Sequence, residues 1–130
     1  MTDRRSFWAW GMESQEPTAA KRESAAKAMS ERFGVSLKTV QPRSVDQLDL
    51  RVPRIKAPDS LSEIVTGDTY ERAFHTYGHS FRDRVRKFDG DFPNPPDVVA
   101  YPRNEADLIA LLDWCGSAGY AATPFGGGSS

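Results

Sequence analysis

Three consecutive glycines followed by two serines form the stretch with the clearest chemical potential. Glycine permits positive φ and lets a ligand approach the bare backbone N–H groups. A run of such donors suits an anion such as a pyrophosphate. Flexible linkers share this composition, so the surrounding elements must decide between a binding loop and a tail. The candidate residues of such an anion-binding loop are Pro124, Phe125, Gly126, Gly127, Gly128, Ser129 and Ser130.

Two histidines four residues apart, His75 and His79, are the candidates for metal binding. This spacing can present two imidazoles to one ion on a helix. However, no cysteine is close in sequence and no glutamate follows the first histidine, as it does in a zinc-protease helix. We therefore expect partly buried, hydrogen-bonded histidines and no metal site.

A basic cluster precedes the proline-rich stretch 93–96. Its members are Arg82, Arg84, Arg86 and Lys87. Such a cluster could meet a phosphate-bearing ligand. Asp83, Asp89 and Asp91 interleave with it, so the pattern favours a self-neutralising surface.

Composition excludes several classes of function. The 130 residues suffice for one modest domain, and a net charge of −1 gives no overall field that would attract nucleic acid. The single Cys115 excludes an internal disulfide, and its place on an apolar helix face indicates packing. No apolar run reaches the length of a transmembrane segment, and no secretory signal is present. We expect a cytoplasmic protein, with peripheral membrane association and a homodimer left open.

The N-terminal part reads as helical and irregular. A helix is predicted over 19–33, between an N-cap at Thr18 and a C-cap at Gly34. A short strand or extended segment is predicted over 35–40, a helical turn near 45–48 and a short helix over 60–67. Aromatic residues recur at helical spacing over 70–88, with a break expected at Gly78. The aromatic residues at 7–10 are expected to dock on a neighbouring surface.

The C-terminal part predicts a strand–helix–strand unit. A strand is expected over 97–101, a helix from the N-cap Asn104 to Gly119, and a second strand over 120–123 that delivers the glycine loop. The glycines follow the second strand, whereas in a Rossmann unit they lie between the first strand and the helix. No Gly-Lys-Ser/Thr sequence follows, which excludes a Walker loop.

The glycine loop and the unit before it resemble a known flavin-binding domain. Pro124 to Ser130, preceded by Pro96-Asp97-Val98-Val99 and the helix unit 102–118, resembles the PCMH-type FAD-binding domain of the vanillyl-alcohol oxidase superfamily. In that superfamily a proline-entered glycine loop wraps the FAD pyrophosphate through backbone amides. The resemblance implies FAD as cofactor and residues 124–130 as its contacts.

Upstream motifs narrow the resemblance to the alkyldihydroxyacetonephosphate synthase (alkylglycerone-phosphate synthase) family. The motifs are Phe7-Trp8-Ala9-Trp10-Gly11, Tyr70-Glu71-Arg72, Tyr77-Gly78-His79 and Pro95-Pro96-Asp97. Phe7, Ala9 and Tyr77 depart from the family pattern. The resemblance implies a transferase of ether-lipid synthesis that exchanges an acyl for an alkoxy group, with FAD as a covalent trap and no net redox change. The family's catalytic residues fall downstream of this sequence, so none is named.

The expected fold is therefore α+β, with a mostly helical lead-in over 1–92. Residues 93–130 are expected to form the opening β-α-β of a PCMH-type FAD-binding domain, truncated in the pyrophosphate loop. Two alternatives stay open. One is an FAD-linked oxidoreductase of a small hydroxy acid such as glycolate or D-lactate, and the other is a non-catalytic fragment. The chain alone is not expected to hold FAD tightly.

Overall fold

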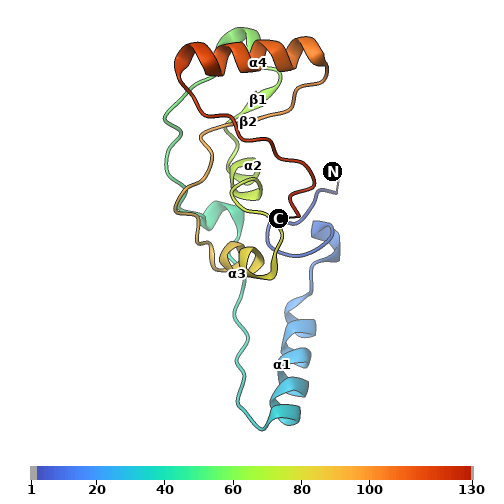
Figure 1. Ribbon diagram of the computed structural model, residues 1–130. Coiled ribbons are helices and arrows are strands. Elements are labelled where there is room, and N and C mark those ends of the chain that lie inside the picture. Colours follow the sequence, from blue (N-terminus) through green and yellow to red (C-terminus); the bar gives the residue numbers. More distant parts are fainter. Residues whose placement is uncertain (1–2, 130) are drawn as a thin grey trace.

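The computed structural model describes residues 3–129, and Met1, Thr2 and Ser130 lie outside the described part. The described residues form four α-helices, a two-stranded sheet and short 3-10 turns (Figure 1). The elements are η1 Glu13–Gln15, α1 Ala19–Phe33, η2 Val45–Gln47, η3 Asp59–Leu61, β1 Val65–Thr66, α2 Thr69–Phe74, α3 Phe81–Asp89, β2 Val99–Ala100 and α4 Glu105–Ala118. The expected mixture of helices and a small amount of strand is confirmed.

The two long helices begin and end at their predicted caps. The Thr18 side chain accepts a hydrogen bond from the backbone of Lys21, and Gly34 closes α1 with a φ of 65°. Asn104 accepts from the backbone of Asp107, and α4 ends at Gly119 with a φ of 69°. These hydroxyl and amide caps satisfy orphan N–H groups, and glycine adopts the left-handed closing conformation without strain.

The aromatic helical pattern over 70–88 is interrupted, as expected from Gly78. Helix α2 ends at Phe74, and α3 starts after Ser80, whose side chain forms a capping box with Asp83. The intervening residues 75–80 carry both histidines. The break matters because it places His79 in a connection beside α2, where its ring can face another segment.

Two predicted elements are wrong. The helix over 60–67 is reduced to η3, and Val65–Thr66 instead forms β1, antiparallel to β2 with Val65 opposite Ala100. The β-branched pair favours strand once a partner is present. Segment 120–123 carries no strand, because no other segment within residues 3–129 pairs with it, and of the two alternatives for 35–40 the strand is not formed. The expected β-α-β therefore has only its first strand and its helix.

The core lies around α2 and is aromatic. Phe7 contacts the ring of Tyr70 edge-on at 6.3 Å and that of Phe92 at 6.4 Å, and all three side chains are buried. Trp8 packs edge-on against Phe88 at 5.3 Å. The prediction that the N-terminal aromatic residues dock on a neighbouring surface is confirmed for Phe7 and Trp8, whereas Trp10 remains 61% exposed.

Helix α4 lies at the far end of the molecule from α1, with the small sheet beneath it (Figure 1). Its apolar residues Leu108, Ile109 and Leu112 remain 43%, 52% and 51% exposed. The C-terminal segment runs from α4 back past α2 and ends beside the N-terminal segment (Figure 1). This return brings the glycine loop to the core around α2.

The basic cluster on α3 is not a uniform solvated surface, which corrects the sequence-based interpretation. Arg84 is 8% exposed and its guanidinium donates to the carbonyl oxygen of Ala9. Lys87 is fully buried, and its Nζ donates to the carbonyl oxygens of Phe74 at 2.8 Å and Tyr77 at 3.2 Å. Long aliphatic stems can cross a core while the charged head finds backbone acceptors.

Asp97 joins the irregular segment that precedes η3 to the start of β2 through hydrogen bonds. Its carboxylate accepts from Arg51 at 2.6 Å and from Arg54 at 2.7 Å, and also from the backbone N–H of Arg54. The Arg54 hydrogen bond is the main reason why the pKa of Asp97 lies well below its ordinary value. Buried Arg72 adds a hydrogen bond to the carbonyl oxygen of Pro96 at 2.8 Å.

Substituting Asp97→Asn is expected to lower the free energy of unfolding by about 1–3 kcal/mol at pH 7, because charge-assisted hydrogen bonds to both arginines are lost. Because the pKa of Asp97 is lower in the folded than in the unfolded protein, its carboxylate stabilises the fold at pH values above the unfolded pKa. This stabilisation is lost as the pH falls below about 4. The variant should therefore lose less stability in acid than the wild type. Urea unfolding at pH 7 and pH 3 measures both effects, with exposed Asp49→Asn as the control. Parallel acid profiles for Asp97→Asn and wild type would contradict this role.

Candidate functional site

The glycine loop is anchored to the core by Phe125. The Phe125 ring is half-buried and lies 6.1 Å from the ring of Phe74, 4.5 Å from His75 and 6.5 Å from His79. Aromatic contacts at these separations are favourable. The segment is therefore held in place on α2, which distinguishes it from a flexible linker.

Gly128 is the glycine that the fold itself requires. Its φ of +66° lies in the left-handed region, and a Cβ at this position would lie 2.5 Å from Cζ of Phe125 and 3.1 Å from Cδ2 of His79. Only glycine permits both the backbone conformation and this close approach. Gly128 thus brings the backbone onto the Phe125 ring and turns the loop.

Gly126 and Gly127 present the open face of the loop. A Cβ added at either position would meet nothing within 4 Å, and both residues are exposed. No hydrogen bond among residues 3–129 uses their backbone N–H groups. A rigidly anchored loop with free N–H donors can accept an anion. Pro124 and Ser129 flank this face and are exposed, whereas Ser130 lies outside the described residues.

The two histidines differ sharply in their hydrogen bonding. His75 Nδ1 lies 2.7 Å from the carbonyl oxygen of Glu71, and its Nε2 lies 3.4 Å from the Tyr101 hydroxyl, so the expected hydrogen-bonded histidine is confirmed there. That hydroxyl also donates to the Glu71 carboxylate at 2.5 Å. In contrast, both ring nitrogens of His79 are buried and have no partner among residues 3–129. The same expectation is wrong for His79.

The surroundings of His79 disfavour the charged imidazolium. Burial is the main cause, and the positive charges of Arg84, Lys87 and Arg5 add to it, lowering the pKa of His79 to about 4. Asp83 opposes the shift without cancelling it. The ring is therefore neutral at pH 7 and carries one N–H donor in a positively charged environment.

The described residues hold no group of three or more histidine, cysteine, aspartate or glutamate side chains that could bind a metal ion. Within the same residues no helix is long and apolar enough to cross a membrane. The free thiol of Cys115 is half-buried on α4, in keeping with its expected place on the apolar side of that helix.

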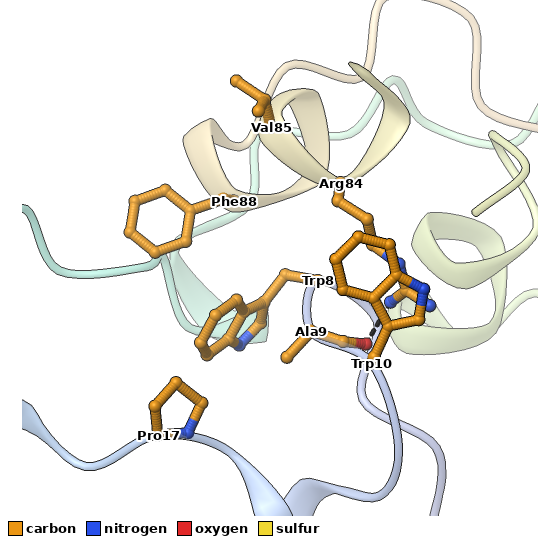
Figure 2. A pocket seen from close by; sticks show the side chains of 7 residues that line it. All are labelled: Trp8, Ala9, Trp10, Pro17, Arg84, Val85 and Phe88. Atoms are coloured by element: carbon orange, nitrogen blue, oxygen red, sulfur yellow. Dashed lines mark hydrogen bonds between the residues drawn. The ribbon is translucent and has the colours of Figure 1, made fainter. Parts of the chain in front are cut away.

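A separate surface hollow of 430 Å³ lies between α3 and the N-terminal segment (Figure 2). Its lining residues are Trp8, Ala9, Trp10, Pro17, Arg84, Val85 and Phe88. The guanidinium of Arg84 already donates to the Ala9 carbonyl oxygen there (Figure 2). The walls are otherwise apolar, and none belongs to the glycine loop, so this hollow is not the phosphate site.

Comparison with curated proteins identifies relatives of the synthase class, all of them alkyldihydroxyacetonephosphate synthases. The Trypanosoma brucei brucei protein is 31% identical over 85 residues, which are 60% of this chain and 14% of that protein. The Caenorhabditis elegans protein is 30% identical over 59 residues, covering 45% and 10% of the two chains. The Dictyostelium discoideum protein is 32% identical over 73 residues, covering 56% and 11%. The resemblance inferred from the sequence is confirmed.

Comparison with solved structures also identifies alkyldihydroxyacetonephosphate synthases as similar in fold. An alkyldihydroxyacetonephosphate synthase superposes with a TM-score of 0.73 at 16% identity, over 98% of this chain and 29% of that chain. A second structure of such a synthase gives a TM-score of 0.72. No protein-family model matches the chain. This chain thus has the fold of part of these synthases and spans a small fraction of the length of its curated relatives.

Sequence reasoning found the loop but missed the residues that hold it. The sequence predicts Phe125 as a cofactor contact, and this stays a prediction for its backbone, while its ring packs against Phe74 and His75. The aromatic spacing at 70–77 indicated a face to be covered, but not which segment covers it. The unpartnered state of His79 had no signal in the sequence, because it depends on what surrounds the ring.

Proposed function

We propose that this chain is the N-terminal part of an FAD-dependent enzyme of the alkyldihydroxyacetonephosphate synthase type. The reaction would exchange the acyl group of acyl-dihydroxyacetone phosphate for an alkyl group in ether-lipid synthesis. The observation that carries the proposal is the fold, which matches such a synthase over 98% of the chain with a TM-score of 0.73. The anchored, open glycine loop supports it at the level of the site.

The loop fits the diphosphate of FAD in two respects. Gly126 and Gly127 offer exposed backbone without side chains, and Gly128 holds that backbone in a fixed turn on Phe125. Their N–H groups would hold the pyrophosphate, with Ser129 as a further donor and Ser130 outside the described residues. Bound FAD would supply an electrophilic flavin ring to the reaction. The contribution of this chain would be to bind and position the dinucleotide.

The division into a lead-in over 1–92 and the start of a PCMH-type FAD-binding domain over 93–130 is part of this proposal. The two regions share one sheet, since β1 lies in the first region and β2 in the second. They also share the contact of Phe125 with Phe74. We accordingly propose that the lead-in serves as a platform for the FAD-binding domain. A lipid-type substrate, a cytoplasmic or membrane-peripheral location and a homodimer belong to the same proposal.

One assay separates the proposal from its alternatives. The intact protein, supplied with acyl-dihydroxyacetone phosphate and a long-chain alcohol, is expected to form the alkyl ether, detected by mass spectrometry. It is not expected to reduce an artificial electron acceptor with glycolate or D-lactate. Acceptor reduction without ether formation would replace the synthase by a hydroxy-acid oxidase. A protein that retains no flavin after gel filtration would favour the non-catalytic fragment.

A further inference from the structure

We propose that His79 is a cofactor-binding residue, whose ring N–H donates a hydrogen bond to a phosphate group held by the glycine loop. The inference rests on the proposed function and deepens it, because it assigns a side-chain contact from the lead-in region to a site otherwise built from backbone. Such a contact would make FAD binding depend on residues outside the FAD-binding domain.

The first argument is the unsatisfied state of the ring. Both His79 nitrogens are buried and have no hydrogen-bond partner among residues 3–129. An unpaired buried polar group costs free energy, and nearly all such groups in native proteins have a partner. His75 faces the same Phe125 ring, and its Nδ1 is partnered by the carbonyl oxygen of Glu71 at 2.7 Å. Of the two histidines, only His79 has both ring nitrogens buried without a partner among residues 3–129, where Arg22 Nε and Arg84 Nε are the other such buried atoms.

The second argument is position. The imidazole lies edge-on to Phe74 at 5.2 Å and to Phe125 at 6.5 Å. Its Cδ2 lies 3.1 Å from the point where a Cβ on Gly128 would stand. His75 lies closer to the Phe125 ring, at 4.5 Å, but His79 and Phe125 supply the atoms nearest to a Cβ on Gly128. A ligand held at the N–H groups of Gly126 and Gly127 would lie on the residues that directly precede Gly128, the glycine that the His79 ring approaches.

The third argument is charge. The charged groups that act electrostatically on the His79 ring are Arg84, Lys87 and Asp83 of α3 and Arg5 of the N-terminal segment. Three cations and one carboxylate leave a positive environment, which adds to the effect of burial in lowering the pKa of His79. A phosphate beside the ring would be attracted by these cations and would accept the N–H of the neutral imidazole.

The test uses the intact protein freed of flavin and titrated with FAD by fluorescence quenching. His79→Phe keeps a ring against Phe74 and Phe125 but removes the donor. We expect it to raise the Kd for FAD about 10- to 100-fold, the size of one lost hydrogen bond to a charged group. His79→Gln, which keeps an N–H donor, should lie between this variant and the wild type. Exposed Arg82→Ala on α3 serves as the charge control and should leave Kd unchanged.

Phosphorus NMR of bound FAD supplies a readout that a packing role would not move. The pyrophosphate resonances are expected to shift in His79→Phe and to return towards the wild-type positions in His79→Gln. Unchanged Kd and resonances in a folded His79→Phe protein would overturn the inference and leave the proposed function standing. A lower melting temperature with unchanged Kd would do the same. Failure of the wild type to bind FAD would instead refute the proposed function.

Discussion

Replacing Gly127 by valine is expected to weaken FAD binding at least about 100-fold while the chain keeps its fold. Gly127 is exposed, and a Cβ on it meets nothing within 4 Å, so the new side chain costs nothing against the rest of the described structure. Its bulk would stand where the phosphate must approach the backbone N–H groups. Loss of flavin from this variant would therefore show that the ligand can no longer reach the backbone N–H groups.

The measurement is the flavin-to-protein absorbance ratio of the intact protein after gel filtration, followed by the Kd for FAD. The matched control is Gly116→Ala in α4, another glycine whose added Cβ meets nothing within 4 Å. This control should keep its flavin and gain up to about 1 kcal/mol of stability from the better helix former. Retention of flavin by Gly127→Val at the wild-type ratio would remove the loop from the site.

Gly128 cannot serve in this experiment, although it is the more constrained glycine. A side chain there would clash with Phe125 and force a left-handed φ on a residue that resists it. Flavin loss in a Gly128 variant would mix the release of the loop from α2 with the loss of the ligand contact. Substitutions at Gly127 therefore test the ligand contact of the loop, whereas substitutions at Gly128 test how the loop is held on α2.

The features that the sequence predicted well are those that neighbouring residues decide. Helix α1 starts directly after Thr18 and α4 directly after Asn104, because each of these N-caps accepts a hydrogen bond from a backbone N–H three residues away. The break between α2 and α3 likewise follows from Gly78 and the capping box at Ser80. These helix ends form without contacts to residues that are distant in the sequence.

The failures all depend on distant segments. Strand β1 forms because it pairs with β2, whereas the local sequence over 60–67 predicts a short helix. The segment 120–123 has strand-like residues and no partner among the described ones. At the site, glycine composition located the loop, but the contact between Phe125 and the His79 ring joins segments far apart in sequence. Burial of charge is hardest to foresee, since alternating signs on α3 indicate a solvated surface.

Lys87 is the clearest case of such buried charge, and its removal is expected to be the most destabilising change in the chain. Lys87→Ala should lower the free energy of unfolding by about 3–5 kcal/mol, since it opens a cavity and leaves two buried carbonyl oxygens without donors. Those oxygens belong to Phe74 and Tyr77, at the end of α2 that supports the glycine loop. Loss of the hydrogen bonds to these oxygens should also weaken the packing of Phe125.

The experiment compares three variants by urea unfolding followed through tryptophan fluorescence. Lys87→Met keeps most of the buried stem and should cost less than Lys87→Ala, about 1–3 kcal/mol, because only the donors are lost. Arg82→Ala removes the same charge from an exposed position on α3 and should stay within about 0.5 kcal/mol of the wild type. Because a buried ammonium also costs desolvation, which lowers the pKa of Lys87 to about 8, the Met variant is the stricter test. If Lys87→Met proves as stable as Arg82→Ala, the two carbonyl bonds contribute nothing net and α2 is held by its aromatic contacts alone.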